Sequence, residues 1–73
     1  MTTEEIKASA AELAAAMRAE HLDAATRQRF IALRGELFQR GVYDPVLVRF
    51  DSATAPRATN AEIAEQLEKI AAA

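Results

Sequence analysis

Side chains that could act in catalysis are scarce in this 73-residue chain, and none stands in a recognisable catalytic arrangement. The only histidine, His21, has no partner at the spacing that a nucleophile and its base require. Ser9 and Ser52 lack the sequence context of an activated serine. Gly35 and Gly41 fit no phosphate-binding pattern. We therefore expect no enzymatic activity and no cofactor, and we expect His21 to be an exposed residue near a helix end.

Composition excludes several further classes of site. The chain has no cysteine, which rules out disulfides and thiolate chemistry, and a single histidine cannot form a histidine-rich metal site. A net charge of −2 gives no general attraction to nucleic acid or to an anionic membrane. No apolar run approaches the roughly 20 residues that span a bilayer. The acidic start lacks the apolar stretch of a signal peptide, so we expect a cytoplasmic protein. The preference for alanine and arginine over lysine and isoleucine indicates a high-GC bacterial source.

Residues suited to recognition are concentrated between Arg40 and Phe50. This segment holds the only tyrosine, all three valines, one of the two glycines and one of the two prolines. Tyrosine and arginine are enriched at binding hot spots. For Tyr43 and Phe50 alone, we favour the interpretation that both rings close one end of the core. The alternative is that they anchor a partner.

Capping residues predict where the first two helices begin and end. Thr2 begins a capping box, which predicts a helix over about residues 3–20. Asp23 as N-cap and Gly41 after the last turn predict a second helix over about residues 24–40.

No glycine or proline separates these two helices, so one continuous helix is the alternative. Their apolar stripes fall on roughly opposite sides of such a helix at 100° per residue; the stripes are Ile6, Leu13 and Met17 in the first part and Phe30, Leu33 and Leu37 in the second. A break near residues 21–23 lets both stripes face one core, and we predict that break.

Two shorter signals describe the rest of the chain. Asp44-Pro45 predicts a helix of one to two turns up to Phe50, whereas a lone strand there would have no partner. Residues 51–58 are typical of an extended connection. Thr59 begins a second capping box, which predicts a helix over about residues 60–72.

These elements predict an all-α fold, a small helical bundle of three main helices plus one short helix, with residues 1–73 as a single domain. Eighteen residues are alanine, which forms helices well but buries little area. A core this small gives marginal stability and raises the expectation of an oligomer or a subunit role.

The second helix carries two apolar stripes. We expect Phe30, Leu33 and Leu37 to be core. Ile31 and Phe38 are seven residues apart and form a second stripe, rotated by about 90° from the first. We favour a central helix that neighbours cover on both stripes. The alternative is that one stripe packs internally and the other meets a partner.

Three further residues of this helix bear on the choice. Arg27 and Arg34 project between the two stripes, where their stems can lie over apolar surface. Gly35 costs about 1 kcal/mol relative to alanine inside a helix. In a chain rich in alanine, this indicates close approach of another backbone, belonging either to this chain or to a partner.

The sequence thus predicts a non-enzymatic protein–protein interaction module or regulatory subunit, which binds another protein chain or itself as a homodimer. We expect binding through the second helix and the Arg40–Phe50 corner. The residues expected at the interface are Ile31, Arg34, Phe38, Tyr43 and Arg49.

Two alternatives remain open. A nucleic-acid-associated accessory protein would use the central arginines; seven of the nine basic residues are arginines between residues 18 and 57. A helix-turn-helix is rejected, because its recognition helix would be too short and mostly apolar. The second alternative is a minor non-catalytic subunit of a multi-chain enzyme.

Overall fold

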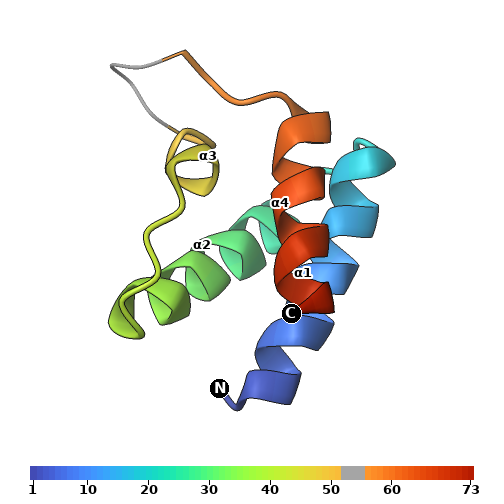
Figure 1. Cartoon of the computed structure of the whole chain (residues 1–73). Coiled ribbons are helices and arrows are strands. Elements are labelled where there is room, and N and C mark those ends of the chain that lie inside the picture. Colours follow the sequence, from blue (N-terminus) through green and yellow to red (C-terminus); the bar gives the residue numbers. More distant parts are fainter. Residues whose placement is uncertain (52–55) are drawn as a thin grey trace.

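Four helices make up the part of the chain that the computed structural model describes, residues 1–51 and 56–73. They are α1 (Thr3–Arg18), α2 (Ala24–Gln39), α3 (Pro45–Val48) and α4 (Asn60–Ala72). No strand occurs within those two ranges. Helices α1 and α4 lie side by side and run in opposite directions, and α2 runs obliquely to this pair (Figure 1). The predicted small all-α bundle, with three main helices and one short helix, is confirmed.

A side chain at the N-cap position begins each long helix with the hydrogen bonds that the sequence predicts. The Thr2 hydroxyl accepts from the Glu5 amide at 3.1 Å, and the Glu5 carboxylate accepts from the Thr2 amide at 2.9 Å. Thr59 and Glu62 repeat this capping box before α4. The Asp23 carboxylate accepts from the third amide of α2 at 2.8 Å. These bonds satisfy amides that have no partner inside their own helix.

The predicted break between α1 and α2 is confirmed, and a left-handed residue makes it. Glu20 has φ of 56°, and it is the only non-glycine residue with positive φ in the described ranges. Its amide donates to the Met17 carbonyl at 3.1 Å, and the His21 amide donates to the Ala16 carbonyl at 2.9 Å. This pair of bonds is the Schellman turn that ends a helix. The chain then reaches Asp23, which begins α2.

The same turn ends α2, here with the glycine that the sequence predicts. Gly41 has φ of 79° and donates to the Phe38 carbonyl at 3.0 Å, while Val42 donates to the Leu37 carbonyl at 2.9 Å. Helix α3 is one turn long, which is the lower limit of the predicted one to two turns.

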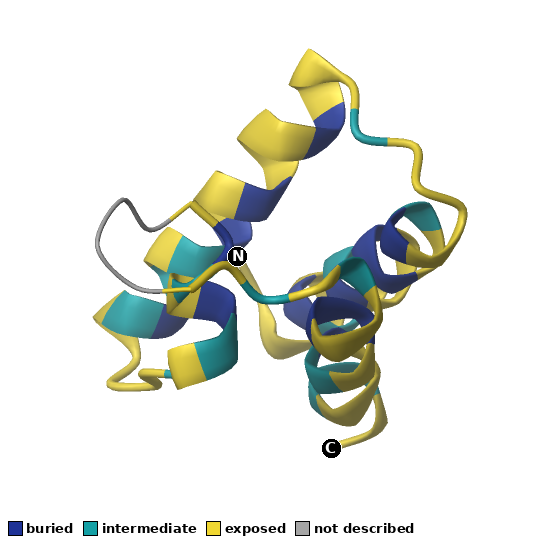
Figure 2. Ribbon diagram, turned by 90° about the horizontal axis from the view of Figure 1, so that it is seen from above, coloured by how far each residue is buried: buried dark blue, intermediate teal, exposed yellow. Residues whose placement is uncertain are grey.

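Apolar residues of all four helices meet in one core, and in Figure 2 the buried positions face the middle of the molecule. The predicted burial of Phe30, Leu33 and Leu37 is confirmed, since none is more than 5% exposed. Phe50 packs its ring on Phe30, with centroids 4.2 Å apart. The other buried residues are Ile6, Ala10, Leu13, Ala14, Met17, Thr26, Leu47, Ile63, Ala64 and Leu67.

One expectation about α2 is wrong, and another is narrowed to one of its two alternatives. Its neighbours cover only one stripe, because Ile31 is 44% exposed and Phe38 is half-buried. Gly35 is exposed, and an added Cβ would have no atom of the described residues within 4 Å, so of the two expected sources of a close backbone only a partner stays open. Helix α2 packs on α1, whereas α3 and α4 pack on each other. The outer side of α2 therefore stays open. Part of the predicted connection, residues 52–55, lies outside the described residues.

Candidate interaction surface

A pair of stacked aromatic rings marks the corner after α2. Tyr43 is 71% exposed, and its ring lies on Phe38, with centroids 5.2 Å apart and an interplanar angle of 33°. The expectation that both corner aromatics close the core is therefore right for Phe50 and wrong for Tyr43. The turn at Gly41 leaves Tyr43 outside, whereas α3 returns the chain so that Phe50 reaches Phe30.

Other apolar side chains extend this exposed area. Val42 is 43% exposed beside the aromatic pair, and Ile31 is 44% exposed two turns earlier on α2. Residues 31, 35 and 38 fall on one side of an α-helix. We call Ile31, Gly35, Phe38, Val42 and Tyr43 the outer face of α2.

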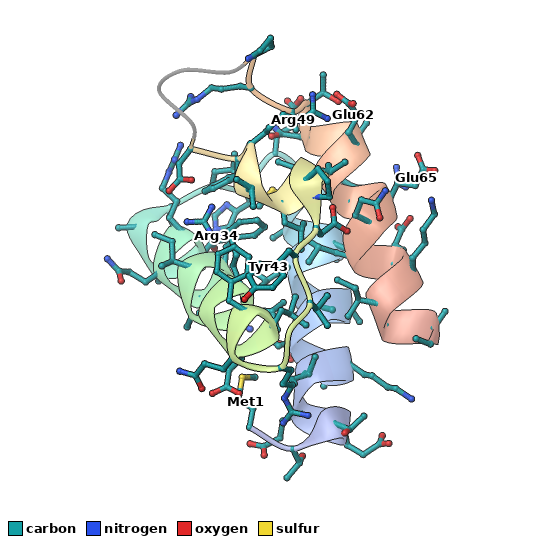
Figure 3. All side chains as sticks on the ribbon, turned by 60° about the vertical axis from the view of Figure 1, so that its left-hand side comes forward. Met1, Arg34, Tyr43, Arg49, Glu62 and Glu65 are labelled. Carbon is teal, nitrogen blue, oxygen red and sulfur yellow. The ribbon has the colours of Figure 1, made fainter. Side chains whose placement is uncertain are left out.

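Arg34 lies at the edge of this face, and it is bound within the fold. Its guanidinium donates to both oxygens of Asp51 at 2.7 and 3.2 Å, and to the Leu47 carbonyl at 3.3 Å. It also lies 5.8 Å from the centroid of the Phe30 ring. Hydrogen bonding to Arg34 lowers the pKa of Asp51 from its ordinary value. Arg34 therefore ties α2 to the chain after α3, and Figure 3 shows it with Tyr43 on the side formed by α2 and α3.

Arg49, which was expected at the same surface, lies elsewhere. Figure 3 places it beside Glu62 at the start of α4, away from Tyr43. The pKa of Glu62 is lowered mainly by its hydrogen bonds with Thr59, and the positive charge of Arg49 adds to this effect. The structure therefore brings together Ile31, Phe38 and Tyr43, keeps Arg34 at their edge, and separates Arg49 from them.

The central arginines are largely engaged in ion pairs. Four of them pair with a carboxylate within the described residues: Arg18 with Glu68, Arg29 with Glu12, Arg34 with Asp51 and Arg40 with Glu36. Arg27 lies 5.7 Å from the centroid of the Phe50 ring. Partners within the same chain therefore neutralise much of this positive charge, and the charge is not concentrated on one face.

No similar protein was found in any comparison: no family model matches the chain, and neither a curated protein nor a solved structure resembles it.

The remaining described surface offers few other features. It contains no pocket and no group of three or more histidine or acidic residues placed to hold a metal ion. His21 is exposed, with Nε2 3.3 Å from the Asp23 carboxylate. Among the described helices, none has the length and apolar character needed to cross a membrane.

Sequence reasoning missed two exposed valines, Val42 and Val48. For Val42 the signal was its place after Gly41, beyond the predicted end of the helix at about residue 40. For Val48 the sequence contains no comparable signal.

Proposed function

We propose that this chain is a non-enzymatic protein-interaction module or regulatory subunit, which binds another protein chain through the outer face of α2. The observation that supports this most strongly is the exposed Tyr43 ring that lies on half-buried Phe38 at the corner. Tyr43 is 71% exposed and held against Phe38 by ring stacking. Exposed apolar groups that lie together on a small protein are typical of interaction sites.

The same pair is suited to binding on physical grounds. Tyrosine offers a large apolar ring and one polar group, which is why it is frequent at hot spots. Stacking on Phe38 already restricts the Tyr43 ring, so a partner loses less conformational entropy when it packs there. Ile31 and Val42 extend the apolar area on either side.

A photo-crosslinking amino acid at position 43 tests this proposal in the cells that produce the protein. We expect a discrete crosslinked protein product from position 43 and none from position 11, an exposed alanine on α1. Phe38→Ala should remove that product while circular dichroism shows that the variant stays folded. Equal products from positions 11 and 43, or a product that survives Phe38→Ala, would contradict the proposal.

The nucleic-acid alternative has less support, because four of the central arginines already pair with carboxylates. Salt distinguishes the two functions. Phosphate contacts weaken steeply as salt rises, whereas an apolar interface changes little. A partner lost between 50 and 200 mM salt would favour nucleic acid.

A further inference from the structure

The outer side of α2 carries a seam with the spacing of a coiled coil. Its members within α2 recur at alternating intervals of four and three residues, and none is charged: Ala24, Gln28, Ile31, Gly35 and Phe38. Four of the five are exposed, whereas Phe38 is half-buried with the Tyr43 ring against it. Alternating intervals of four and three let two helices pack along each other over several turns.

Gly35 has no role inside the monomer. Its φ is not positive, so its backbone does not require glycine, and an added Cβ would meet no atom within 4 Å. A helical glycine nevertheless costs about 1 kcal/mol relative to alanine. On the seam it leaves the backbone bare, so that a large side chain of another helix can approach closely.

We propose that a second copy of this chain covers the seam, with the two α2 helices antiparallel about a two-fold axis. This inference rests on the proposed function of the outer face of α2. We place the two-fold axis beside residue 33 of both copies. Two residues then face each other across the interface when their residue numbers add to 66. The facing pairs are then Ile31 with Gly35 and Phe38 with Gln28. Each branched or aromatic side chain meets a smaller or unbranched one, which is the self-complementarity that a two-fold interface requires.

Charges on the flank of the seam are compatible with this pairing. Two Arg34 side chains come near the axis, but Asp51 already neutralises each of them at 2.7 Å. Arg27 comes opposite Gln39 of the other copy, in the last turn of α2 where free carbonyls carry partial negative charge. The seam itself has no charge, so an uncharged seam is its best partner.

The proposed interface is small. One seam covers a single helix of 16 residues. Such a contact buries on the order of 1,000 Å² in total, which is the lower end for specific interfaces. Interfaces of this size are typical of weak or transient association, so we expect a reversible dimer.

Sedimentation equilibrium from about 10 µM to 1 mM tests the pairing on the intact chain. We expect the mass to rise from 7.9 kDa towards twice that value. Gly35→Ala should raise the dissociation constant at least tenfold while raising the thermal midpoint of the monomer. Ile31→Glu should abolish the dimer. Ala11→Glu on the exposed side of α1 should leave the dimer unchanged.

Disulfide trapping tests the register, because the natural chain has no cysteine. Ala32 is exposed and lies next to the proposed axis, so Ala32→Cys should form a covalent dimer under mild oxidation. Ala61→Cys on the exposed side of α4 is the matched control and should stay monomeric.

A mass of 7.9 kDa at every concentration would overturn the second-copy proposal. So would a dimer that Gly35→Ala and Ile31→Glu do not weaken, or equal trapping at positions 32 and 61. If the chain is monomeric but position 43 crosslinks to a different protein, the proposed function stands. The partner at the outer face of α2 is then that protein and not a second copy of this chain. If neither a dimer nor a crosslink forms, both proposals fail.

Discussion

Glu20 adopts a conformation that residues with a Cβ rarely use. Its φ of 56° places it in the left-handed region, which costs such a residue about 1–2 kcal/mol. The turn that ends α1 requires this conformation, because only then can the His21 amide reach the Ala16 carbonyl. The cost is offset by the core, since this turn lets the apolar sides of α1 and α2 face each other.

Replacing Glu20 by glycine should stabilise the protein. Glycine adopts positive φ at little steric cost, so we expect Glu20→Gly to raise the free energy of unfolding by up to about 1 kcal/mol. Urea denaturation followed by circular dichroism measures this. Glu20→Ala is the control and should give no such gain, because alanine has the same strain. A less stable glycine variant would show that the glutamate side chain supplies a compensating contact.

Helix α2 has two different sides, and each should respond differently to truncation. Phe30, Leu33 and Leu37 face the core, whereas Ile31 faces outwards and is 44% exposed. The neighbouring positions 31 and 33 therefore provide a matched comparison within one helix.

Leu33→Ala should lower the free energy of unfolding by about 2–5 kcal/mol, because it leaves a cavity at a site that is 1% exposed. Ile31→Ala should change it by less than about 0.5 kcal/mol, as is usual for exposed positions. Both are measured by urea denaturation at low micromolar concentration, where association does not contribute. An unchanged midpoint for Leu33→Ala would mean that this stripe is not core.

Folding favours the ionised form of several carboxylates spread over the molecule. Five have a pKa below the ordinary value, because they accept hydrogen bonds from capped helix ends or from a guanidinium: Glu5, Asp23, Asp51, Glu62 and Glu68. A group whose pKa is lowered on folding binds more protons in the unfolded state. Its stabilising effect is therefore complete above the ordinary pKa and is lost as pH falls through the folded value.

Acid should therefore destabilise the fold. We expect the urea midpoint to stay level from pH 7 to about pH 5 and to fall as pH drops below about 4, the ordinary carboxyl range. Asp51→Asn should start from a lower midpoint at pH 7 and lose less on acidification, because it lacks the ionised partner of Arg34. A midpoint that rises in acid would contradict this linkage.

The candidate site could be predicted only in part. The seven-residue spacing of Ile31 and Phe38 indicated a second stripe on α2, and the structure leaves that stripe uncovered or half-covered. Tyr43 and Phe50 could not be distinguished, since both are aromatic and flank the same corner. Arg34 and Arg49 looked alike in sequence, but Asp51 binds Arg34 beside the outer face, whereas Arg49 lies near Glu62.

Helix beginnings and ends were determined by the sequence, because each cap joins atoms three to five residues apart. The Thr2 and Thr59 capping boxes and the turn at Gly41 follow from such local contacts. Burial was decided by tertiary structure alone, because it depends on chain segments distant in sequence. Arg18 meets Glu68, fifty residues away, as α4 packs along α1. With α4 on α1, nothing in the described residues covers the outer side of α2, and so the fold rather than the pattern leaves Ile31 and Tyr43 exposed.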